Sequence, residues 1–207
     1  MFTFLQIPVG GFDENFSYIV WEEERRKGAL VDPTGSFAKI KEAFSPLLPP
    51  IAVEYILLTH SHKDHLSALE EAKEFFRIRK VLGHPANPFV NMPVKDGEKI
   101  PLGRGNICSI FTPGHTADSV SYLTDDFSAL FTGDTLFVDY CGFAQDEDAL
   151  FDSLHKRIFP LPDKIMVCSG HDYGKVPCRT LGEEKHLNPY LKAETREEFA
   201  AVMKLLE

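Results

Sequence analysis

The sequence predicts an α/β protein in which two β-sheets are covered by helices, within a single domain spanning residues 1–207. Strand-like runs occur in both halves of the chain and are mixed with stretches of helical spacing. Many of these strands have the short connections of antiparallel neighbours, which favours two mixed sheets over one doubly wound parallel sheet. No linker, low-complexity segment or short-period repeat divides the chain, so we expect one domain.

The individual elements are predicted from apolar periodicity and from turn residues. Runs of apolar, β-branched and aromatic residues predict strands at 2–9, 15–21, 28–32, 53–59, 94–100, 106–112, 119–124, 128–132 and 164–169. Helices are predicted at 36–48, 67–79, 146–159, 180–187 and 195–206. The segment GGFDEN reads as a turn after the first strand, and the Pro- and Asn-rich residues 85–93 read as a loop.

The composition is that of an ordinary folded protein with an acidic balance. Hydrophobic residues make up 43% of the chain and charged residues 26%, which supports a packed core and argues against disorder. The formal net charge of −9 argues against a nucleic-acid partner, because phosphate binding requires a basic face. No apolar run approaches the ~18 residues that a membrane span requires, so we expect no membrane association.

Cysteine usage and the N-terminus favour a cytoplasmic protein. Four cysteines form neither a C-x-x-C pair nor zinc-finger spacing: Cys108, Cys141, Cys168 and Cys178. So few cysteines in a chain of this length do not suggest a disulfide scaffold, and a reducing compartment is the simpler interpretation. The first residues, MFTFLQIPVG, lack a basic segment followed by a long apolar one, so no signal peptide is expected.

Four apolar strands are each followed by a polar loop that contains histidine or aspartate. The loops read THSHKDH, TPGHTADS, TGDTLF and SGHDYG, and they supply His60, His62, Asp64, His65, His115, Asp134 and His171. Ligand sites commonly form where such loops leave the carboxyl ends of strands. Imidazole and carboxylate groups are ligands of borderline divalent metals. The sequence therefore predicts a metal site built from these seven residues.

The spacing inside HSHKDH allows two neighbouring metals. His60 and His62 are two residues apart, so in an extended chain they point the same way. Asp64 and His65 follow where the chain bends towards the next helix, and they can point to a second centre. Two ions ~3.5–4 Å apart can hold a hydroxide and polarise a carbonyl or phosphoryl oxygen.

The pattern H-x-H-x-D-H, followed by a distant His, a distant Asp and a last His, resembles the metallo-β-lactamase fold superfamily. The resemblance runs from GGFDENFSYIV through ALVDPTG to GHDYG. It implies a four-layer αβ/βα sandwich of two mixed sheets flanked by helices, with the metals at one edge. Within the superfamily, TPGHTADS, TGDTLF and GHDY are similar to both glyoxalase II and the persulfide dioxygenases. The ending EEKHLNPYL is more similar to the persulfide dioxygenases and short glyoxalase II-like proteins.

The resemblance implies ligand sets for either two metals or one. In the dinuclear hydrolases of the family, one metal would be held by His60, His62 and His115. The second would be held by Asp64, His65 and His171, and Asp134 would bridge the two. In the persulfide dioxygenases a single Fe(II) would sit on His60, His115 and Asp134 and keep positions open for oxygen and thiol. The expected cofactor is therefore two divalent metals (zinc, or else iron or manganese), with one Fe(II) as the alternative.

The first functional hypothesis is a metal-dependent hydrolase of a thioester or related acyl substrate, similar to glyoxalase II, the hydroxyacylglutathione hydrolase. A metal-bound hydroxide would attack the acyl carbon, and the thiolate would leave. Asp64 and Tyr173 are the candidate catalytic residues. Asp64 would orient the nucleophile, and Tyr173 would contact the thiol carrier. An equally good interpretation of Tyr173 is that its ring only packs beside the site. Asp32 in LVDPTG is either a residue that orients a ligand histidine or a turn residue before proline.

Two further hypotheses remain open. The LNPYL ending motivates a mononuclear iron persulfide dioxygenase that oxidises a persulfide to sulfite. The minor alternatives are another hydrolase or a nuclease of the same fold, or a non-catalytic metal protein, and the acidic charge disfavours the nuclease. The partner in the leading hypotheses is a small thiol-linked molecule, and the oligomeric state stays open between monomer and homodimer.

One departure from both branches concerns glutathione. They usually carry a basic residue just after CG that grips a glutathione carboxylate, whereas here CGFAQDED places Phe143 there. Phenylalanine cannot make a charge-assisted hydrogen bond, so another thiol carrier is a candidate. The chain continues for 36 residues beyond His171, and we expect no C-terminal helical glutathione-binding domain.

Overall fold

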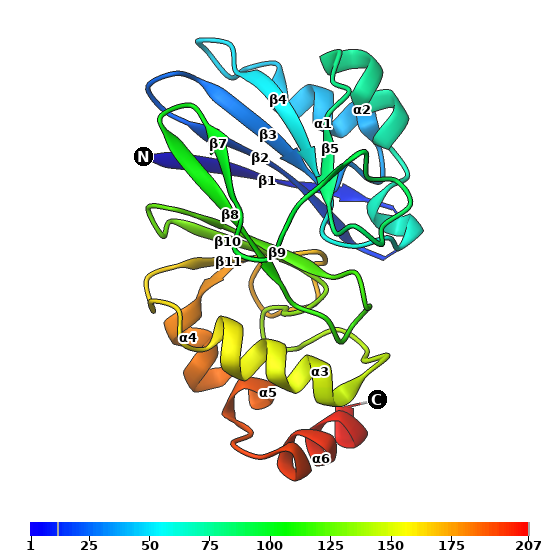
Figure 1. Ribbon diagram of the computed structural model, residues 1–207, viewed down its shortest axis with the longest axis vertical. Coiled ribbons are helices and arrows are strands. Elements are labelled where there is room, and N and C mark those ends of the chain that lie inside the picture. The colour runs from blue at the N-terminus through cyan, green and yellow to red at the C-terminus, as the bar shows by residue number, and fades with distance from the viewer. Residues whose placement is uncertain (12, 207) are drawn as a thin grey trace.

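The computed structural model describes residues 1–11 and 13–206, so Phe12 of the predicted turn and Glu207 fall outside the described residues. Two six-stranded sheets form the centre of the molecule, and helices cover their outer faces (Figure 1). The strand order is β1-β2-β3-β4-β5-β6 in the first sheet and β12-β11-β10-β9-β8-β7 in the second. Each sheet contains parallel and antiparallel pairs, as the β3–β4 and β1–β2 pairs illustrate. The predicted sandwich of two mixed sheets flanked by helices is confirmed.

The first sheet and its two helices come from the N-terminal half of the chain. Its strands are β1 (Phe2–Gly10), β2 (Asn15–Glu22), β3 (Lys27–Val31), β4 (Ala52–Leu57), β5 (Val81–Gly83) and β6 (Met92–Pro93). Helices α1 (Phe37–Phe44) and α2 (Leu69–Phe76) pack on the outer face through apolar residues such as Ile40, Leu69 and Ala72. Arg77 ends α2 in the left-handed conformation, with φ at 54°.

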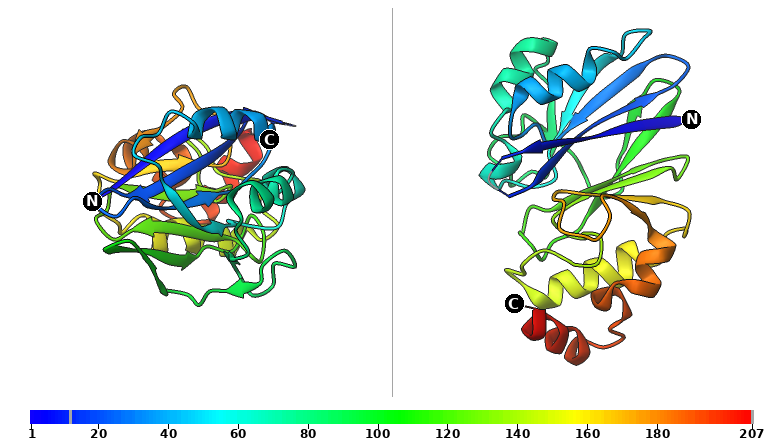
Figure 2. Two further views of the ribbon diagram at one scale, coloured as in Figure 1. Left: turned by 90° about the horizontal axis from the view of Figure 1, so that it is seen from above. Right: turned by 180° about the vertical axis from the view of Figure 1, so that it is seen from behind.

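The second sheet and the remaining helices come from the C-terminal half. Its strands are β7 (Lys99–Leu102), β8 (Gly105–Phe111), β9 (Val120–Thr124), β10 (Ala129–Gly133), β11 (Met166–Ser169) and β12 (Arg179–Thr180). The helices are α3 (Glu147–Asp152), which continues as a π-helical turn (Ser153–Ile158), then α4 (Leu181–Leu187), α5 (Pro189–Lys192) and α6 (Arg196–Leu206). The two helical layers lie at opposite ends of the molecule when it is seen from the front or from behind (Figure 2).

Three apolar cores account for the four layers. One fills the space between the sheets and includes Tyr18, Tyr122 and Phe131, while the other two lie under the helices of each half. Strand β2 is buried along its whole length because it has a core on both faces. In the part of the chain that the structure describes, no helix combines the length and the apolar character needed to cross a bilayer.

The structure corrects the sequence prediction in the segment 94–100 and in the C-terminal region. The predicted strand 94–100 is wrong: β6 ends at Pro93, and β7 begins only at Lys99. Proline cannot donate to the ladder, and Gly97 turns the chain with φ at 73°. Sequence reasoning also missed β12, α5 and the short strand β6, which lies at the end of the predicted loop 85–93. The start of α5 carries a clear signal, because Asn188 caps the Tyr190 N–H and Pro189 occupies the first turn.

Hydrogen bonds between the two sheets fix the edge where the site forms. The Tyr18 hydroxyl of the first sheet donates to the Ser169 carbonyl of the second at 2.6 Å. In the opposite direction, the Tyr122 hydroxyl donates to the Leu58 carbonyl at 2.9 Å. Both phenols are buried, and burial raises the pKa of each above its usual range. They therefore stay protonated and hold the ends of β4 and β11 in register across the interface.

Candidate metal centre

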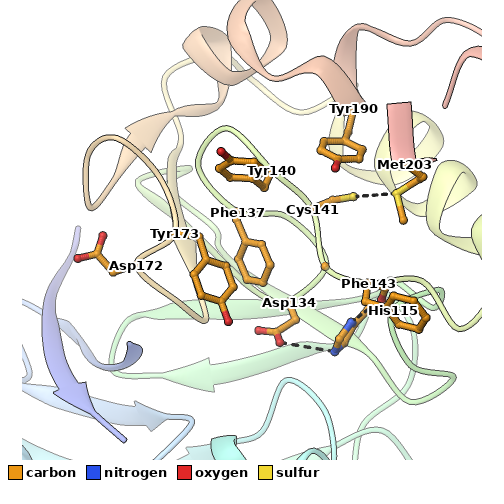
Figure 3. Close-up of a pocket in the computed structure, with 11 residues that line it drawn as sticks. His115, Asp134, Phe137, Tyr140, Cys141, Phe143, Asp172, Tyr173, Tyr190 and Met203 are labelled. Carbon is orange, nitrogen blue, oxygen red and sulfur yellow. Dashed lines mark hydrogen bonds and ion pairs between the residues drawn. The ribbon is translucent and has the colours of Figure 1, made fainter. Parts of the chain in front are cut away.

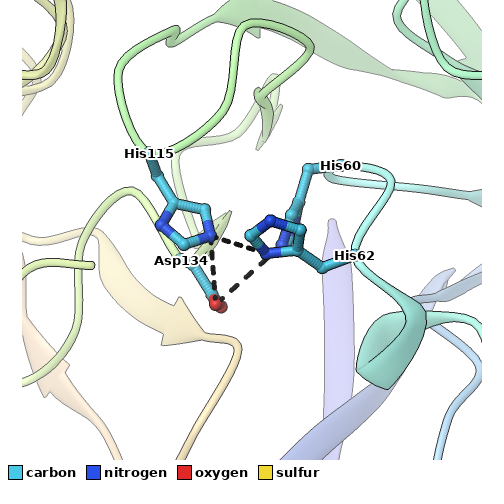
Figure 4. A group of neighbouring side chains, drawn as sticks. All are labelled: His60, His62, His115 and Asp134. Atoms are coloured by element: carbon cyan, nitrogen blue, oxygen red, sulfur yellow. Dashed lines mark hydrogen bonds and ion pairs between the residues drawn. The ribbon is translucent and has the colours of Figure 1, made fainter. Parts of the chain in front are cut away.

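The seven predicted ligand residues converge where the loops after β4, β8, β10 and β11 meet. They form two groups, and within each group one ligand atom per residue lies within 4.8 Å of the others. The first group, drawn in Figure 4, contains His60, His62, His115 and Asp134. The second group contains Asp64, His65 and His171. Residues up to 111 positions apart in the sequence are thus brought into one small volume.

Asp134 lies between the two groups. Its Oδ2 is 3.5 Å from His115 Nε2 in the first group and 3.3 Å from His171 Nε2 in the second. Its Oδ1 is 3.2 Å from His65 Nε2. One carboxylate therefore faces nitrogen atoms on both sides, which is the placement that a bridging ligand requires.

The contacts inside the two groups fit a bound cation. His62 Nδ1 and His115 Nε2 approach to 3.0 Å, and His65 Nε2 and His171 Nε2 approach to 3.2 Å. The buried Nε2 of His60 has no hydrogen-bond partner among the described residues. Converging lone pairs and an unpartnered buried nitrogen are costly unless a proton or metal joins them. Because the donors are mostly imidazole nitrogens, they suit zinc or iron better than calcium or magnesium.

Asp32 holds two ligand histidines in position from the end of β3. Its Oδ2 is 3.1 Å from His65 Nδ1 and accepts a 2.6 Å hydrogen bond from the Thr59 hydroxyl. Its Oδ1 accepts from the Thr59 backbone N–H at 2.8 Å, and the Thr59 hydroxyl is 3.0 Å from His60 Nδ1. Asp32 keeps a φ of 44°, unusual for a residue with a side chain. Of its two interpretations, these contacts match that of orienting the ligands.

Backbone carbonyls orient two further ligand histidines. His115 Nδ1 donates to the Phe143 carbonyl at 2.7 Å, and His171 Nδ1 donates to the Asp13 carbonyl at 2.5 Å. A hydrogen bond donated by Nδ1 fixes the orientation of the ring, so that Nε2 is the atom left to bind a metal. In both residues that Nε2 faces Asp134. The backbone carbonyls thus aim the Nε2 atoms of both histidines into the centre.

The two carboxylates of the centre remain ionised. The hydrogen bond with His171 lowers the pKa of Asp64, and burial opposes this effect. Burial alone would raise the pKa of Asp134, but the nearby His65 and His171 outweigh it and hold that pKa well below its usual range. Ionised carboxylates are the form that coordinates a metal.

The histidines divide into two kinds by their proton affinity. Burial lowers the pKa of His60 and of His115. Burial also opposes the charged form of His171, but hydrogen bonds with Asp134 and Asp64 raise its pKa to about 9. In the same way, the Asp134 charge outweighs burial and raises the pKa of His65. At neutral pH the second group therefore carries protons that a metal must displace.

Sequence reasoning missed the contributions of Asn15, Thr59 and the Asp13 carbonyl. Asn15 Nδ2 lies 3.3 Å from Asp64 Oδ2 and 3.4 Å from His171 Nε2. Thr59 stands directly before the H-x-H-x-D-H motif, so its position was a local signal. Asn15 and Asp13 gave no such signal in the sequence. They lie at or just before the start of β2, which meets the loop after β11 only in the folded protein.

Tyr173 lies beside the centre with its hydroxyl turned to another partner. Its ring stacks on His171 with centroids 4.8 Å apart and an angle of 9° between the planes, and its hydroxyl donates to the Asp13 carboxylate. Burial and this acceptor raise the pKa of the phenol above its usual range. The ring also lines a cavity, so the predicted contact with a thiol carrier remains a prediction.

A cavity of about 740 Å³ opens next to the metal centre (Figure 3). His115 and Asp134 belong to its lining, and Phe143 stands at its mouth with 68% of its surface exposed. The departure noted in the sequence is therefore located beside the ligands. A substrate bound in this cavity would meet the Phe143 ring at the same end as the ligands, because Figure 3 places Phe143 beside His115.

The chain belongs to the metallo-beta-lactamase superfamily, whose family profile matches residues 10–171. This assignment agrees with the two-sheet sandwich, with the seven-residue ligand set and with the resemblance found in the sequence. The class of protein is thus an enzyme of the metallo-β-lactamase fold with a divalent metal cofactor.

Its relatives include both hydrolases and dioxygenases. The chain is 30% identical over 195 residues to the probable polyketide biosynthesis zinc-dependent hydrolase BaeB of Bacillus velezensis, covering 89% of this chain and 85% of the relative. It is 30% identical to the human mitochondrial persulfide dioxygenase ETHE1, covering 91% and 75%. It is 33% identical to a hydroxyacylglutathione hydrolase of Rhodopseudomonas palustris, covering 87% and 71%.

A solved structure extends the similarity to the fold as a whole. The crystal structure of ETHE1 from Myxococcus xanthus superposes with a TM-score of 0.86 at 30% identity, covering 99% of this chain and 91% of that one. The membership in the glyoxalase II and persulfide dioxygenase branch is therefore shown, while both chemistries are represented among the relatives.

Proposed function

We propose that the protein hydrolyses a thioester with the help of two divalent metals, in the manner of glyoxalase II. The observation that carries this proposal is the presence of two adjacent ligand groups that share Asp134. Each group offers at least three donors, and all seven side chains are in place. In this proposal Asp64, His65 and His171 act directly as ligands of the second ion.

The chain's own residues supply positioning and charge for this reaction. His60, His62 and His115 would hold one ion, Asp64, His65 and His171 the other, and Asp134 would contact both. When bound, such ions lower the pKa of water and polarise the acyl carbonyl. Asp64 is ionised and the most exposed carboxylate of the centre, so it can accept a hydrogen bond from the attacking water. The departing thiol needs no general acid, because its own pKa is near ~8.5.

The cysteine that lines the cavity, Cys141, does not serve as the nucleophile in this proposal. Cys141 lines the cavity but is buried, and burial raises the pKa of its thiol far above the usual range. A thiol held in its protonated form is a poor nucleophile. Its Sγ instead lies 3.7 Å from the Met203 sulfur, which joins the loop after β10 to α6.

A persulfide dioxygenase is the second candidate, and the similarity to the ETHE1 proteins favours it. In this case His60, His115 and Asp134 would hold one Fe(II), with the remaining four residues kept as surrounding polar groups. Those three residues lie in the first ligand group, so the same geometry can serve this chemistry. The two candidates differ in the number of metals, in the need for oxygen and in the importance of Asp64 and His65.

Metal stoichiometry combined with two activity assays separates the candidates. Protein purified without added metals is analysed for zinc, iron and manganese, and is assayed for thiol release from thioesters and for persulfide-dependent oxygen uptake. We expect two metals per chain and thiol release. The variant His65→Ala should retain one metal and lose thiol release, whereas His186→Ala, at an exposed histidine of α4, should change neither. One iron per chain with oxygen uptake that survives His65→Ala would replace the hydrolase with the dioxygenase.

We further propose that the described residues form one domain acting on a small thiol-linked molecule, without nucleic acid or membrane partners. The three cores share strands across both sheets, which supports treating them as one unit. Gel-shift assays at low and at physiological salt test the nucleic-acid partner, and size-exclusion chromatography with light scattering tests the oligomeric state. Retarded nucleic acid at physiological salt would contradict this proposal.

A further inference from the structure

The cavity beside the metal centre has two chemically different ends. Figure 3 shows Asp134 and His115 at one end and Tyr190 and Met203 at the other. Its volume of about 740 Å³ lies within the ~300–1,000 Å³ typical of small-molecule sites. The polar end belongs to the metal centre, so a reacting group placed there leaves most of the volume to be filled by the rest of the substrate.

Aromatic rings and sulfur atoms form most of the remaining wall. The principal side chains are Phe137, Tyr140, Phe143, Tyr173, Tyr190 and Met203. Tyr190 and Met203 are buried and come from α5 and α6, and the Cys141–Met203 sulfur contact fastens this wall to the loop after β10. A wall fixed by buried side chains is formed before the ligand arrives. Aromatic faces and thioether sulfur favour apolar, especially aromatic, ligand groups.

The described residues that line the cavity include no lysine and no arginine. Outside the metal centre, the charged side chain among the described lining residues is that of Asp172, which is exposed. In the loop that carries Tyr140, the neighbouring Asp139 pairs with Arg179 at 2.5 Å, and the same guanidinium contacts the buried Glu184 at 3.0 Å. This cation is thus already neutralised by two carboxylates. A carboxylate on the substrate would find no cationic side chain among the described residues of the wall, and Asp172 carries a charge of the same sign.

We propose that the substrate is a thioester bearing an aromatic or comparably bulky apolar group and no carboxylate, with that group filling the cavity towards Tyr190 and Met203. This inference rests on the proposed thioester hydrolysis and narrows its substrate class. In the reaction, water adds its oxygen to the acyl carbon and the carbon–sulfur bond breaks. The products are a carboxylic acid and a thiol that takes up a proton. In this proposal the cavity wall selects the substrate, and the metal centre cleaves the carbon–sulfur bond.

Three uncleavable analogues of equal length test the selection by binding alone. They are thioethers of N-acetylcysteamine that carry a 4-methylbenzyl, a 4-carbamoylbenzyl or a 4-carboxybenzyl group. Calorimetry with the zinc-loaded protein measures each dissociation constant. We expect the methyl analogue to bind about tenfold more tightly than the carboxylate, the usual scale for one unpaired charged group. The carboxamide separates charge from polarity, and it should bind between the other two.

A single substitution at the rim should change the preference. Phe143→Arg places a guanidinium at the mouth of the cavity and keeps the backbone carbonyl that accepts from His115. We expect this variant to bind the carboxylate analogue about tenfold more tightly than the wild type does. The matched control is Phe89→Arg, because Phe89 is also an exposed phenylalanine, at 46%, and does not line the cavity. It should leave all three dissociation constants unchanged.

The outcomes separate this inference from the proposed function. Equal binding of the methyl and carboxylate analogues to the wild type, or no measurable binding of the methyl analogue, would overturn the inference. So would an unchanged preference in Phe143→Arg. The thioethers cannot be cleaved, so the expected binding order in a protein that hydrolyses no thioester supports the selectivity and refutes the hydrolase alone.

Discussion

The metal centre and the far end of the adjoining cavity are built from chemically different side chains. In the centre, buried imidazoles and carboxylates approach within 3.0–3.5 Å, and outer groups such as Asp32 fix several of them. At the far end, rings and sulfur atoms of residues such as Tyr190 and Met203 pack without formal charge. The first region gains its order from directional bonds, and the second from shape. We therefore expect substitutions in the centre to affect chemistry and those in the wall to affect substrate choice.

The largest effect should follow replacement of the carboxylate that faces both ligand groups. Asp134→Asn keeps the shape of the side chain but removes the negative charge that His65, His115 and His171 surround. We expect thioester hydrolysis to fall at least about 100-fold and the metal content to fall below that of the wild type. Elemental analysis together with a thiol-release assay measures both. Full activity with a full metal complement would refute the role of Asp134 as a shared ligand.

The next largest effect should come from a residue that contacts no metal. Asp32→Ala leaves the Thr59 hydroxyl and His65 Nδ1 without their acceptor in a buried position. Loss of such an orienting group typically weakens metal binding by about 10–100-fold. Competition titration against a chelator measures this affinity, and Asp32→Asn should restore part of it. Asp163→Asn, at an exposed carboxylate, is the control. If Asp32→Ala leaves the metal affinity unchanged, Asp32 serves only as a turn residue.

The pH dependence of stability should differ between the metal-free and metal-loaded proteins. His171 has its folded pKa raised to about 9 and His65 has its pKa raised as well, so both stabilise the metal-free fold when protonated. That stabilisation is complete below pH ~6.5 and is lost as the pH rises towards 9, at up to about 1.4 kcal/mol per proton and pH unit. Thermal unfolding should therefore shift to lower temperature over this range in chelator-treated protein. Zinc-loaded protein should lack this shift, because the metal has already displaced the protons.

The smallest effect should come from the boundary between the two regions. Tyr173→Phe removes the hydroxyl that donates to Asp13 but keeps the ring that stacks on His171. Because this bond is partly exposed, we expect a loss of about 1 kcal/mol in the free energy of unfolding. The kcat for thioester hydrolysis should change less than about threefold, and the metal content should not change. Steady-state kinetics and urea unfolding measure these quantities, and a tenfold fall in kcat would make the hydroxyl part of the reaction.

Much of the fold was predictable because its signals are local. The strands β2, β3, β4, β8, β9, β10 and β11 follow apolar runs bounded by turn residues, and the structure has them at nearly the predicted positions. Errors arose where a turn was read as part of a strand, as at 94–100, where the charged residues around Gly97 separate β6 from β7. They also arose where an element is too short to show periodicity, as in α5.

The sequence by itself predicted the seven candidate metal ligands, since their residue types and their positions after apolar strands already restrict the chemistry. Only the tertiary structure decided which atoms orient them. The contacts of Asn15, of the Asp13 carbonyl and of Asp32 join segments far apart in the chain, and no periodicity records such contacts. The cavity wall follows the same rule: Phe143, Tyr190 and Met203 come from separate loops and helices, and they become neighbours only when the cores between them are packed.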